Sequence, residues 1–268
     1  MSDTPNTPAA PATPQTPAIK EPKSVKDFLA LPAYKSRFEE VLGKRANQFM
    51  ASVVSASSSS ALSKADPRSV IASAMVAATL DLPVNPTIGM AHIVAYGNVA
   101  QFQIGYKGLI QLALRSGQYL RLNAGPVNAG VFTGYDNMGE PILDWSKFDP
   151  LAPPAGYFAG WQLVNGFTKT AYWTKDQCLA HGKRFSKSFS SSSSPWKTDP
   201  DAMCTKTVLK LTLSKWGPLS IEMQKAMTHD QGAQRDVDAP IDYIDVQADN
   251  IPTAREEPIN PFAAPPAP

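Results

Sequence analysis

The chain has 268 residues, of which 43% are hydrophobic and 18% charged, enough apolar material for one packed domain. Its 25 prolines gather at the ends, with 6 in residues 1–23 and 7 in residues 240–268. Such segments carry too few large apolar side chains to offset the entropy lost on ordering. We therefore expect disordered tails at 1–23 and 232–268, on either side of a folded core at 24–231.

The formal net charge of +2 conceals an uneven distribution. The C-terminal segment 232–268 contains seven acids and two arginines, whereas the core 24–231 contains 21 basic and 14 acidic residues. The C-terminal segment therefore has a net charge of −5 and the core a net charge of +7.

Several classes of protein are excluded. The longest apolar run, 70–80, is too short to span a bilayer, and no basic region followed by an apolar core marks a secretory signal. Cys178 and Cys204 alone cannot form a disulfide framework, which suits a reducing cytoplasm. The three histidines lack metal-ligand spacing. We expect a cytoplasmic protein without a membrane partner, a metal or a cofactor.

The first part of the core is predicted to be helical. Ser24 is a candidate N-cap for a short helix that Pro32 ends, and Asp66-Pro67 has the residue types of an N-cap and first helical position. Apolar residues after Pro67 recur at helical spacing until Pro83 stops the pattern. The predicted helices cover residues 24–31, 34–43, 45–57 and 67–82.

Two hairpins dominate the next part. Gly97-Asn98 and Asn165-Gly166 are turn dipeptides between runs of strand-forming residues, at 90–96 and 99–104 and at 157–164 and 167–174. Between the hairpins we expect a helix at 106–116, capped by Gly117, and short strands broken by glycines at 118–145. After them we expect helices at 174–184, 199–215 and 219–227 and a serine-rich loop at 186–194. Because helices and antiparallel hairpins come in clusters, the fold class is α+β.

Catalytic motifs are missing from the sequence. It contains no phosphate-cradling glycine loop, no nucleophile elbow and no zinc-protease motif. Asp199 and Asp201 have the spacing of a paired-carboxylate metal site. Acids at a helix N-terminus also stabilise the helix dipole, and this simpler interpretation is favoured. We therefore predict no catalytic residues, no metal site and no enzymatic activity.

Positive charge is concentrated late in the core. Ten basic residues and four acids lie between Lys169 and Lys225, with aromatic residues among them. Cationic side chains neutralise phosphates and aromatic rings stack on bases, so the pattern suits a single-stranded nucleic acid. A solvated face above core aromatics fits it equally. The candidate DNA-binding residues in this stretch are Lys183, Arg184, Trp196, Lys197, Lys206 and Lys210.

Two of these candidates form a pair. Lys206 and Lys210 lie four residues apart on one predicted helical face, away from the stripe of Leu209 and Leu213. We expect both lysines to be free to contact phosphates, so that replacing them by alanine hardly changes stability.

An earlier junction supplies further candidates. Gly105-Tyr106-Lys107-Gly108 lies between a predicted strand and a predicted helix, where backbone N–H groups and Lys107 could hold a phosphate. An ordinary structural junction would have the same sequence. Tyr106, Arg115 and Arg121 complete the candidate DNA-binding set.

Two blocks of sequence are similar to the signature of a known family. The first comprises 82–98 and 103–117, including Gln103-Ile104-Gly105-Tyr106-Lys107-Gly108. The second comprises 195–210 and 216–222, including Pro195-Trp196-Lys197-Thr198-Asp199. Together with an earlier block at 28–46, they occur in the order and spacing of the RecT family of phage single-strand annealing recombinases. The resemblance covers roughly residues 24–230.

The resemblance implies a function and a fold. RecT proteins anneal complementary DNA strands without ATP, during phage-type homologous recombination in a bacterial host. They act as rings or helical filaments on single-stranded and annealed duplex DNA, beside a 5′-3′ exonuclease and a host single-strand binding protein. The implied fold is a curved antiparallel sheet of hairpins backed by helices. Within the matching motifs, DNA contact is implied for Lys107, Arg115, Lys197, Lys206 and Lys210.

Two other functions remain open from the residues. One is a Mg²⁺-dependent nuclease that uses Asp199 and Asp201. The other is a single-strand binding protein that coats DNA without annealing it.

Overall fold

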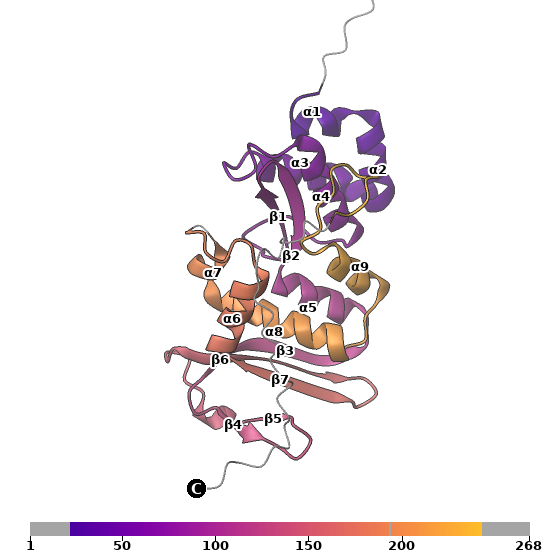
Figure 1. The fold of residues 1–268 in the computed structure, drawn as a ribbon. Coiled ribbons are helices and arrows are strands. Elements are labelled where there is room, and N and C mark those ends of the chain that lie inside the picture. Colours follow the sequence, from indigo (N-terminus) through magenta and orange to yellow (C-terminus); the bar gives the residue numbers. More distant parts are fainter. Residues whose placement is uncertain (1–21, 193, 243–268) are drawn as a thin grey trace, which may run out of the picture. The chain divides into compact units, whose positions relative to one another are not determined.

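The computed structural model describes residues 22–192 and 194–242 (Figure 1). Of the tails expected at 1–23 and 232–268, residues 1–21 and 243–268 lie outside the described residues, whereas 22–23 and 232–242 lie within them. Within the described ranges the chain divides into two compact units. Unit 1 comprises residues up to 103 together with 234–239, and unit 2 comprises 104–233 and 240–242. The chain therefore passes between the units three times.

Unit 1 is mainly helical, as predicted. Its elements are α1 (Val25–Ala30), α2 (Pro32–Leu42), the 3-10 turn η1 (Gly43–Arg45), α3 (Ala46–Ser57), α4 (Pro67–Thr79), β1 (Ala91–Tyr96) and β2 (Val99–Ile104), whose last residue begins unit 2. Ser24 and Asp27 form a capping box at α1. Pro32 is the first residue of α2, so it opens a second helix directly after the short one.

Helix α4 is the centre of unit 1. Asp66 caps it by accepting a hydrogen bond from the N–H of Arg68, and every residue from Ser69 to Ala78 is buried. The buried hydroxyl of Ser69 donates to the Asp66 carbonyl and accepts from the N–H of Ala100 at 2.9 Å. This serine therefore fixes the start of α4 to strand β2.

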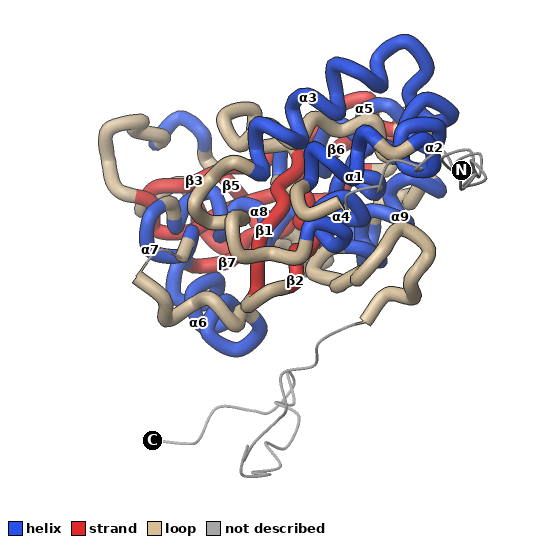
Figure 2. The backbone as a smooth tube through the Cα atoms, turned by 90° about the horizontal axis from the view of Figure 1, so that it is seen from above, coloured by secondary structure: helices blue, strands red, loops and turns tan. Residues whose placement is uncertain are grey.

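Unit 2 is built on an antiparallel three-stranded sheet with the order β3-β6-β7. Its elements are α5 (Tyr106–Arg115), β3 (Tyr119–Asn128), β4 (Phe132–Tyr135), β5 (Pro141–Leu143), the 3-10 turn η2 (Trp145–Lys147), β6 (Pro154–Leu163), β7 (Thr168–Thr174), α6 (Lys175–Phe185), α7 (Pro195–Thr198), α8 (Pro200–Trp216) and α9 (Ile221–His229). Helices α5, α6 and α8 pack on one face of the sheet (Figure 1). The α+β class and the antiparallel pairing are confirmed, and Figure 2 shows the helices and strands in separate colours.

The strands differ in detail from the prediction. The two predicted hairpins belong to separate sheets, because β1 pairs with β2 alone. Gly125 does not break β3, which runs continuously for 10 residues. Gly125 pairs with Phe158 on β6, and a Cβ at Gly125 would lie 4.0 Å from the Phe158 ring, an ordinary van der Waals contact.

The turn of the second hairpin is one residue longer than predicted. The N–H of Leu163 donates to the carbonyl of Phe167, and the N–H of Gly166 donates to the carbonyl of Leu163. Gly166 has a φ of +89°, so residues 164–166 form a three-residue loop with glycine in the left-handed region.

Helices α6 and α8 are joined to the sheet by a buried polar group. The Tyr157 hydroxyl donates to Asp201 at 2.5 Å, and Cys178 and Cys204 are buried beside it. Burial and the hydrogen bond to Asp201 raise the pKa of Tyr157, and a hydrogen bond with Cys204 raises the pKa of Cys178. Both groups are therefore neutral at physiological pH.

Replacing Gly182 with alanine tests how closely α6 contacts α7. In an isolated helix this change stabilises by about 1 kcal/mol. In the fold, a Cβ at Gly182 would lie 2.6 Å from Cη2 of the buried Trp196 ring. We therefore expect Gly182→Ala to lower the free energy of unfolding by ~1–3 kcal/mol, measured in urea. Adding Trp196→Phe should relieve part of the strain, whereas a stabilised Gly182→Ala protein would contradict the packing.

Candidate nucleic-acid interface

A buried carboxylate holds two of the predicted DNA-binding residues. Asp230, the C-cap of α9, has a fully buried side chain. It accepts hydrogen bonds from Nζ of Lys206 at 3.3 Å, Nζ of Lys210 at 2.5 Å and the N–H of Ile104 at 3.1 Å. We call Lys206, Lys210 and Asp230 the Asp230 triad. It joins α8, the end of α9 and the residue before the N-cap of α5.

The ionisation of the triad follows from burial and charge. Burial alone would raise the pKa of Asp230, but the two ammonium groups and the Ile104 N–H hold it below its usual value. Burial lowers the pKa of Lys206, and the charge of Asp230 opposes that effect. One buried carboxylate thus faces two lysine side chains.

The expectation that Lys206 and Lys210 are free for phosphate is therefore wrong. Their side chains are 13% and 30% exposed and both contact Asp230. For the same reason we now expect that replacing both lysines lowers the stability, since the change would leave a carboxylate buried without a cation. Helical spacing placed the two lysines on one face, but that face is turned toward another part of the fold.

Trp196 also differs from the prediction. Its side chain is only 5% exposed, so its ring cannot stack on a base without local opening. The ring packs over Gly182 of α6 and lies 5.5 Å from the Phe189 ring. Trp196 is a core residue that holds α7 and the serine-rich loop against α6.

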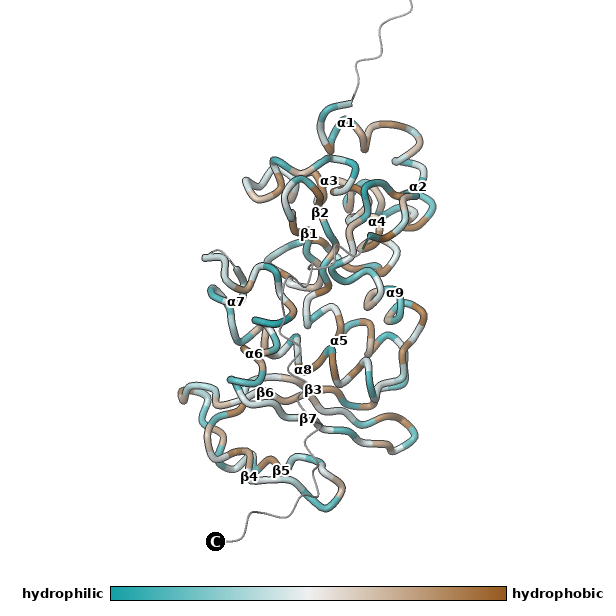
Figure 3. The backbone as a smooth tube through the Cα atoms, viewed as in Figure 1, coloured by the Kyte–Doolittle hydropathy of each residue, from teal (hydrophilic) through white to brown (hydrophobic). Residues whose placement is uncertain are grey.

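This packing brings exposed basic residues together. Lys183 and Arg184 are exposed on the last turn of α6, and Lys197 is exposed on α7. We call these three residues the α6–α7 basic cluster. The Arg184 guanidinium lies 5.0 Å from the Phe185 ring centre and Nζ of Lys197 lies 5.7 Å from that of Phe189. In Figure 3, both helices include hydrophilic residues, drawn in teal. The surface thus offers charge for phosphates beside rings for bases.

The positive charges of this region affect the pKa of His181. Its ring lies between Trp173 and Phe185, with centroid distances of 5.6 Å and 4.5 Å. Burial and the positive charges of Arg184 and Lys210 lower its pKa, so it is neutral at physiological pH. The region's positive charge therefore comes from lysine and arginine.

A second aromatic and basic site was missed by the sequence analysis. Trp216, the last residue of α8, is 47% exposed. Nζ of Lys169 and Nζ of Lys215 lie 4.6 Å and 5.2 Å from the ring centre. Lys169 also forms an ion pair with Glu140, whereas Lys215 has no ion pair with any residue in the described ranges. The sequence signal was an aromatic residue next to lysine at the end of a helix, just before Gly217.

The other candidates are separated. Tyr106 is half-buried and Lys107 exposed in the first turn of α5, and Arg115 is exposed in its last turn. Arg121 pairs with Gln162 on β6, whose neighbours Trp161 and Leu163 are buried. Since side chains alternate along a strand, Arg121 lies on the sheet face opposite these buried residues. The structure therefore does not bring Arg121 to the helices.

The two acids of the alternative nuclease site have structural partners. Asp199 caps α8 by accepting from the N–H of Ala202, and Asp201 accepts from Tyr157. Within the described ranges, no three histidine, cysteine, aspartate or glutamate side chains gather as metal ligands would.

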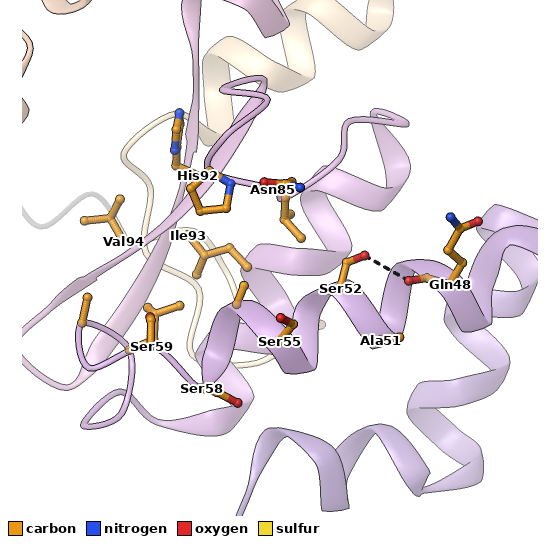
Figure 4. A pocket seen from close by; sticks show the side chains of 15 residues that line it. Gln48, Ala51, Ser52, Ser55, Ser58, Ser59, Asn85, His92, Ile93 and Val94 are labelled. Atoms are coloured by element: carbon orange, nitrogen blue, oxygen red, sulfur yellow. Dashed lines mark hydrogen bonds between the residues drawn. The ribbon is translucent and has the colours of Figure 1, made fainter.

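Unit 1 contains a cavity of about 980 Å³ between α3, the loop after it and β1 (Figure 4). Its lining includes hydroxyls of Ser52 and Ser55 and the side chains of Asn85, His92 and Val94. The lining residues include no lysine, arginine, aspartate or glutamate. The cavity thus lacks the cations that a phosphate backbone needs.

Comparison with known proteins decides the family. A model described as the RecT family matches residues 47–243, more than half of the chain. The chain belongs to the RecT family. Membership supports a DNA-binding recombination protein of the single-strand annealing type.

Two relatives illustrate the match of this RecT-family chain. It is 49% identical over 239 residues to the uncharacterized protein YqaK of Bacillus subtilis (strain 168), covering 88% of this chain and 81% of that protein. It is 29% identical over 180 residues to Protein RecT of Escherichia coli (strain K12), covering 64% of this chain and 65% of that protein. No helix in the part described here is both long and apolar enough to cross a membrane.

Replacing Asp230 with asparagine tests the triad. The change leaves two lysines without their carboxylate, so we expect the free energy of unfolding at pH 7 to fall by ~3–5 kcal/mol. The pKa of Asp230 is lowered by folding, so its stabilisation is present above the unfolded value of about 3.9 and is lost as pH falls through the folded value.

Urea unfolding at pH 7 and in acid measures both effects. The difference between wild type and Asp230→Asn should shrink in acid. Asp242→Asn is the control, because the Asp242 side chain is exposed. Equal stabilities of Asp230→Asn and wild type at pH 7 would rule out a structural triad.

Proposed function

We propose that this protein anneals complementary single strands of DNA without ATP, and that the α6–α7 basic cluster contacts the strand it holds. The observation that carries the proposal is the group of exposed Lys183, Arg184 and Lys197 beside Phe185 and Phe189. RecT-family membership supports single-strand annealing, and this surface has the chemistry that the substrate requires.

The mechanism we propose is electrostatic. Two complementary strands repel each other through their phosphates, and each folds on itself. A surface that neutralises one backbone while leaving the base edges accessible lets the second strand pair with less repulsion. No covalent bond changes in this process, so we propose that the protein is not an enzyme and needs no cofactor.

Trp216 extends this surface. Helix α8 has 17 residues, so its two ends are roughly 25 Å apart at 1.5 Å per residue. The α6–α7 basic cluster lies near the start of α8, and Trp216 with Lys215 lies at its end. We propose that a single strand contacts both, with phosphates on the lysines and arginine and a base on the indole ring.

We also propose self-assembly on DNA as a ring or helical filament. Each subunit offers a few exposed cations, and linking many weak contacts along one strand raises the overall affinity. The partners we propose are single-stranded and annealed duplex DNA, a phage 5′-3′ exonuclease and the host single-strand binding protein. The proposed location is the cytoplasm of the bacterial host.

Pairing of labelled complementary oligonucleotides, without ATP or Mg²⁺, tests the proposal. The protein should accelerate duplex formation in proportion to its coverage of the strand. Slower pairing than in protein-free buffer would indicate a single-strand binding protein that only coats DNA. Shortened strands after incubation with Mg²⁺ would indicate the nuclease instead.

The double change Lys183→Gln and Arg184→Gln tests the α6–α7 basic cluster. Each lost phosphate contact should lower the slope of log K against log salt by about 0.7 for single strands, so the slope should fall by about 1.4. Fluorescence anisotropy with a labelled oligonucleotide measures it. Lys26→Gln in α1 is the control for charge, and an unchanged slope in the double variant would remove the cluster from the interface.

Trp216→Ala tests base stacking separately. A stacked base contributes ~1–3 kcal/mol, independently of phosphate charge. We therefore expect weaker single-strand binding with an unchanged salt slope, and partial recovery in Trp216→Phe. Wild-type affinity in Trp216→Ala would exclude stacking at this residue.

A further inference from the structure

A loop at the end of the described chain carries two acids onto helix α2. The backbones of Ala233 and Asp242 exchange two hydrogen bonds, at 2.9 Å and 2.8 Å, and close the loop between them. Nε2 of Gln234 donates to the carbonyl of Ala239 across the loop at 3.0 Å. We call residues 234–239 the acidic loop. They lie inside the segment that composition assigned to a disordered tail.

The acidic loop is held by two side chains of α2. Nη1 and Nη2 of Arg37 donate to the two oxygens of Asp238 at 2.7 Å and 2.6 Å. The Tyr34 hydroxyl donates to the Asp236 carboxylate at 3.1 Å. Tyr34 and Arg37 lie three residues apart, so they share one face of α2.

The chemistry on α2 is that of an anion site. A guanidinium fork matches the oxygens of carboxylate and phosphate in the same bidentate way, and a phenol hydroxyl adds one donor. The positive charge of Arg68 on α4 also acts on the Tyr34 phenol. Asp238 raises the pKa of Arg37, so the guanidinium stays charged. Asp236 and Asp238 thus accept hydrogen bonds from Tyr34 and Arg37 that a phosphate oxyanion could accept in the same way.

The ion pair between Arg37 and Asp238 is accessible to a competing anion from solvent. The Asp238 side chain is 77% exposed and the Arg37 side chain 40% exposed, and exposed ion pairs of this kind are weak and screened by salt. Tyr34 and Arg37 also precede residues 47–243, the range that matches the family model, whereas the acidic loop lies within it.

We propose that Tyr34 and Arg37 form a second phosphate-binding site for single-stranded DNA, which Asp236 and Asp238 cover until the DNA backbone displaces them. This inference rests on the proposed DNA-binding function. It gives the acidic loop a regulatory role, because each subunit must release its own carboxylates before this site can add to binding.

The change Asp238→Asn tests the inference. It keeps the size of the side chain and removes the charge that occupies Arg37, whereas Asp236 also accepts the Val237 N–H and is left in place to hold the loop. In wild type the displaced Asp238 carboxylate regains a cation, which offsets the counterion released by the phosphate that binds Arg37. In Asp238→Asn this offset is lost, so the salt slope should steepen by about 0.7 and the gain in affinity between 200 and 50 mM salt should be about 2.6-fold larger than in wild type.

Two further variants make the result specific. Glu40→Gln removes one negative charge from an exposed position on the same helix and should leave the slope as in wild type. Arg37→Gln in the Asp238→Asn background should return the slope to the wild-type value. Thermal midpoints of all variants, measured on the same preparations, show that each is folded.

The outcomes separate this inference from the proposed function. Wild-type protein that does not bind single-stranded DNA at any salt concentration would overturn both. Wild-type binding with the same slope in Asp238→Asn, or an equal rise in Glu40→Gln, would overturn the inference alone. A steeper slope in Asp238→Asn that Arg37→Gln removes would support it.

Discussion

The organisation of unit 2 depends on one buried carboxylate, Asp230. A charged carboxyl group in the interior is costly unless cations and hydrogen-bond donors surround it. Lys206 and Lys210 must therefore face inward, and the N–H of Ile104 is fixed beside them. Three elements distant in sequence are brought to one point, and the first turn of α5 and the middle of α8 take their positions from it.

This constraint separates the basic residues into two groups with different roles. The lysines of the Asp230 triad contribute to stability, whereas Lys183, Arg184 and Lys197 remain exposed on short elements around the buried Trp196. Trp196 and Gly182 make one packed contact, and the exposed cations on either side of it are positioned by that contact. The cluster that we propose contacts DNA is thus positioned by core residues that are themselves buried.

Local signals explain why much of the fold could be predicted. The caps at Ser24, Asp66 and Thr174 and the turns at Gly97 and Gly166 act within a few residues, so the sequence shows them directly. The partner of Lys206 is 24 residues away and has no local signature. Helical periodicity shows which residues share a face, but it does not show which way that face points. Exposure likewise distinguishes Trp216 from Trp196, and it depends on contacts across the fold.

Because the chain passes between the two units three times, the position of a C-terminal truncation affects both units. Composition suggests residue 231 as the end of a minimal core, but residues 232–242 supply the partners of Tyr34 and Arg37 and the backbone pair that closes the acidic loop. A fragment that ends at 231 would lose residues 234–239 of unit 1 and residues 232–233 and 240–242 of unit 2. The shortest C-terminally truncated fragment that retains every contact described here ends at residue 242.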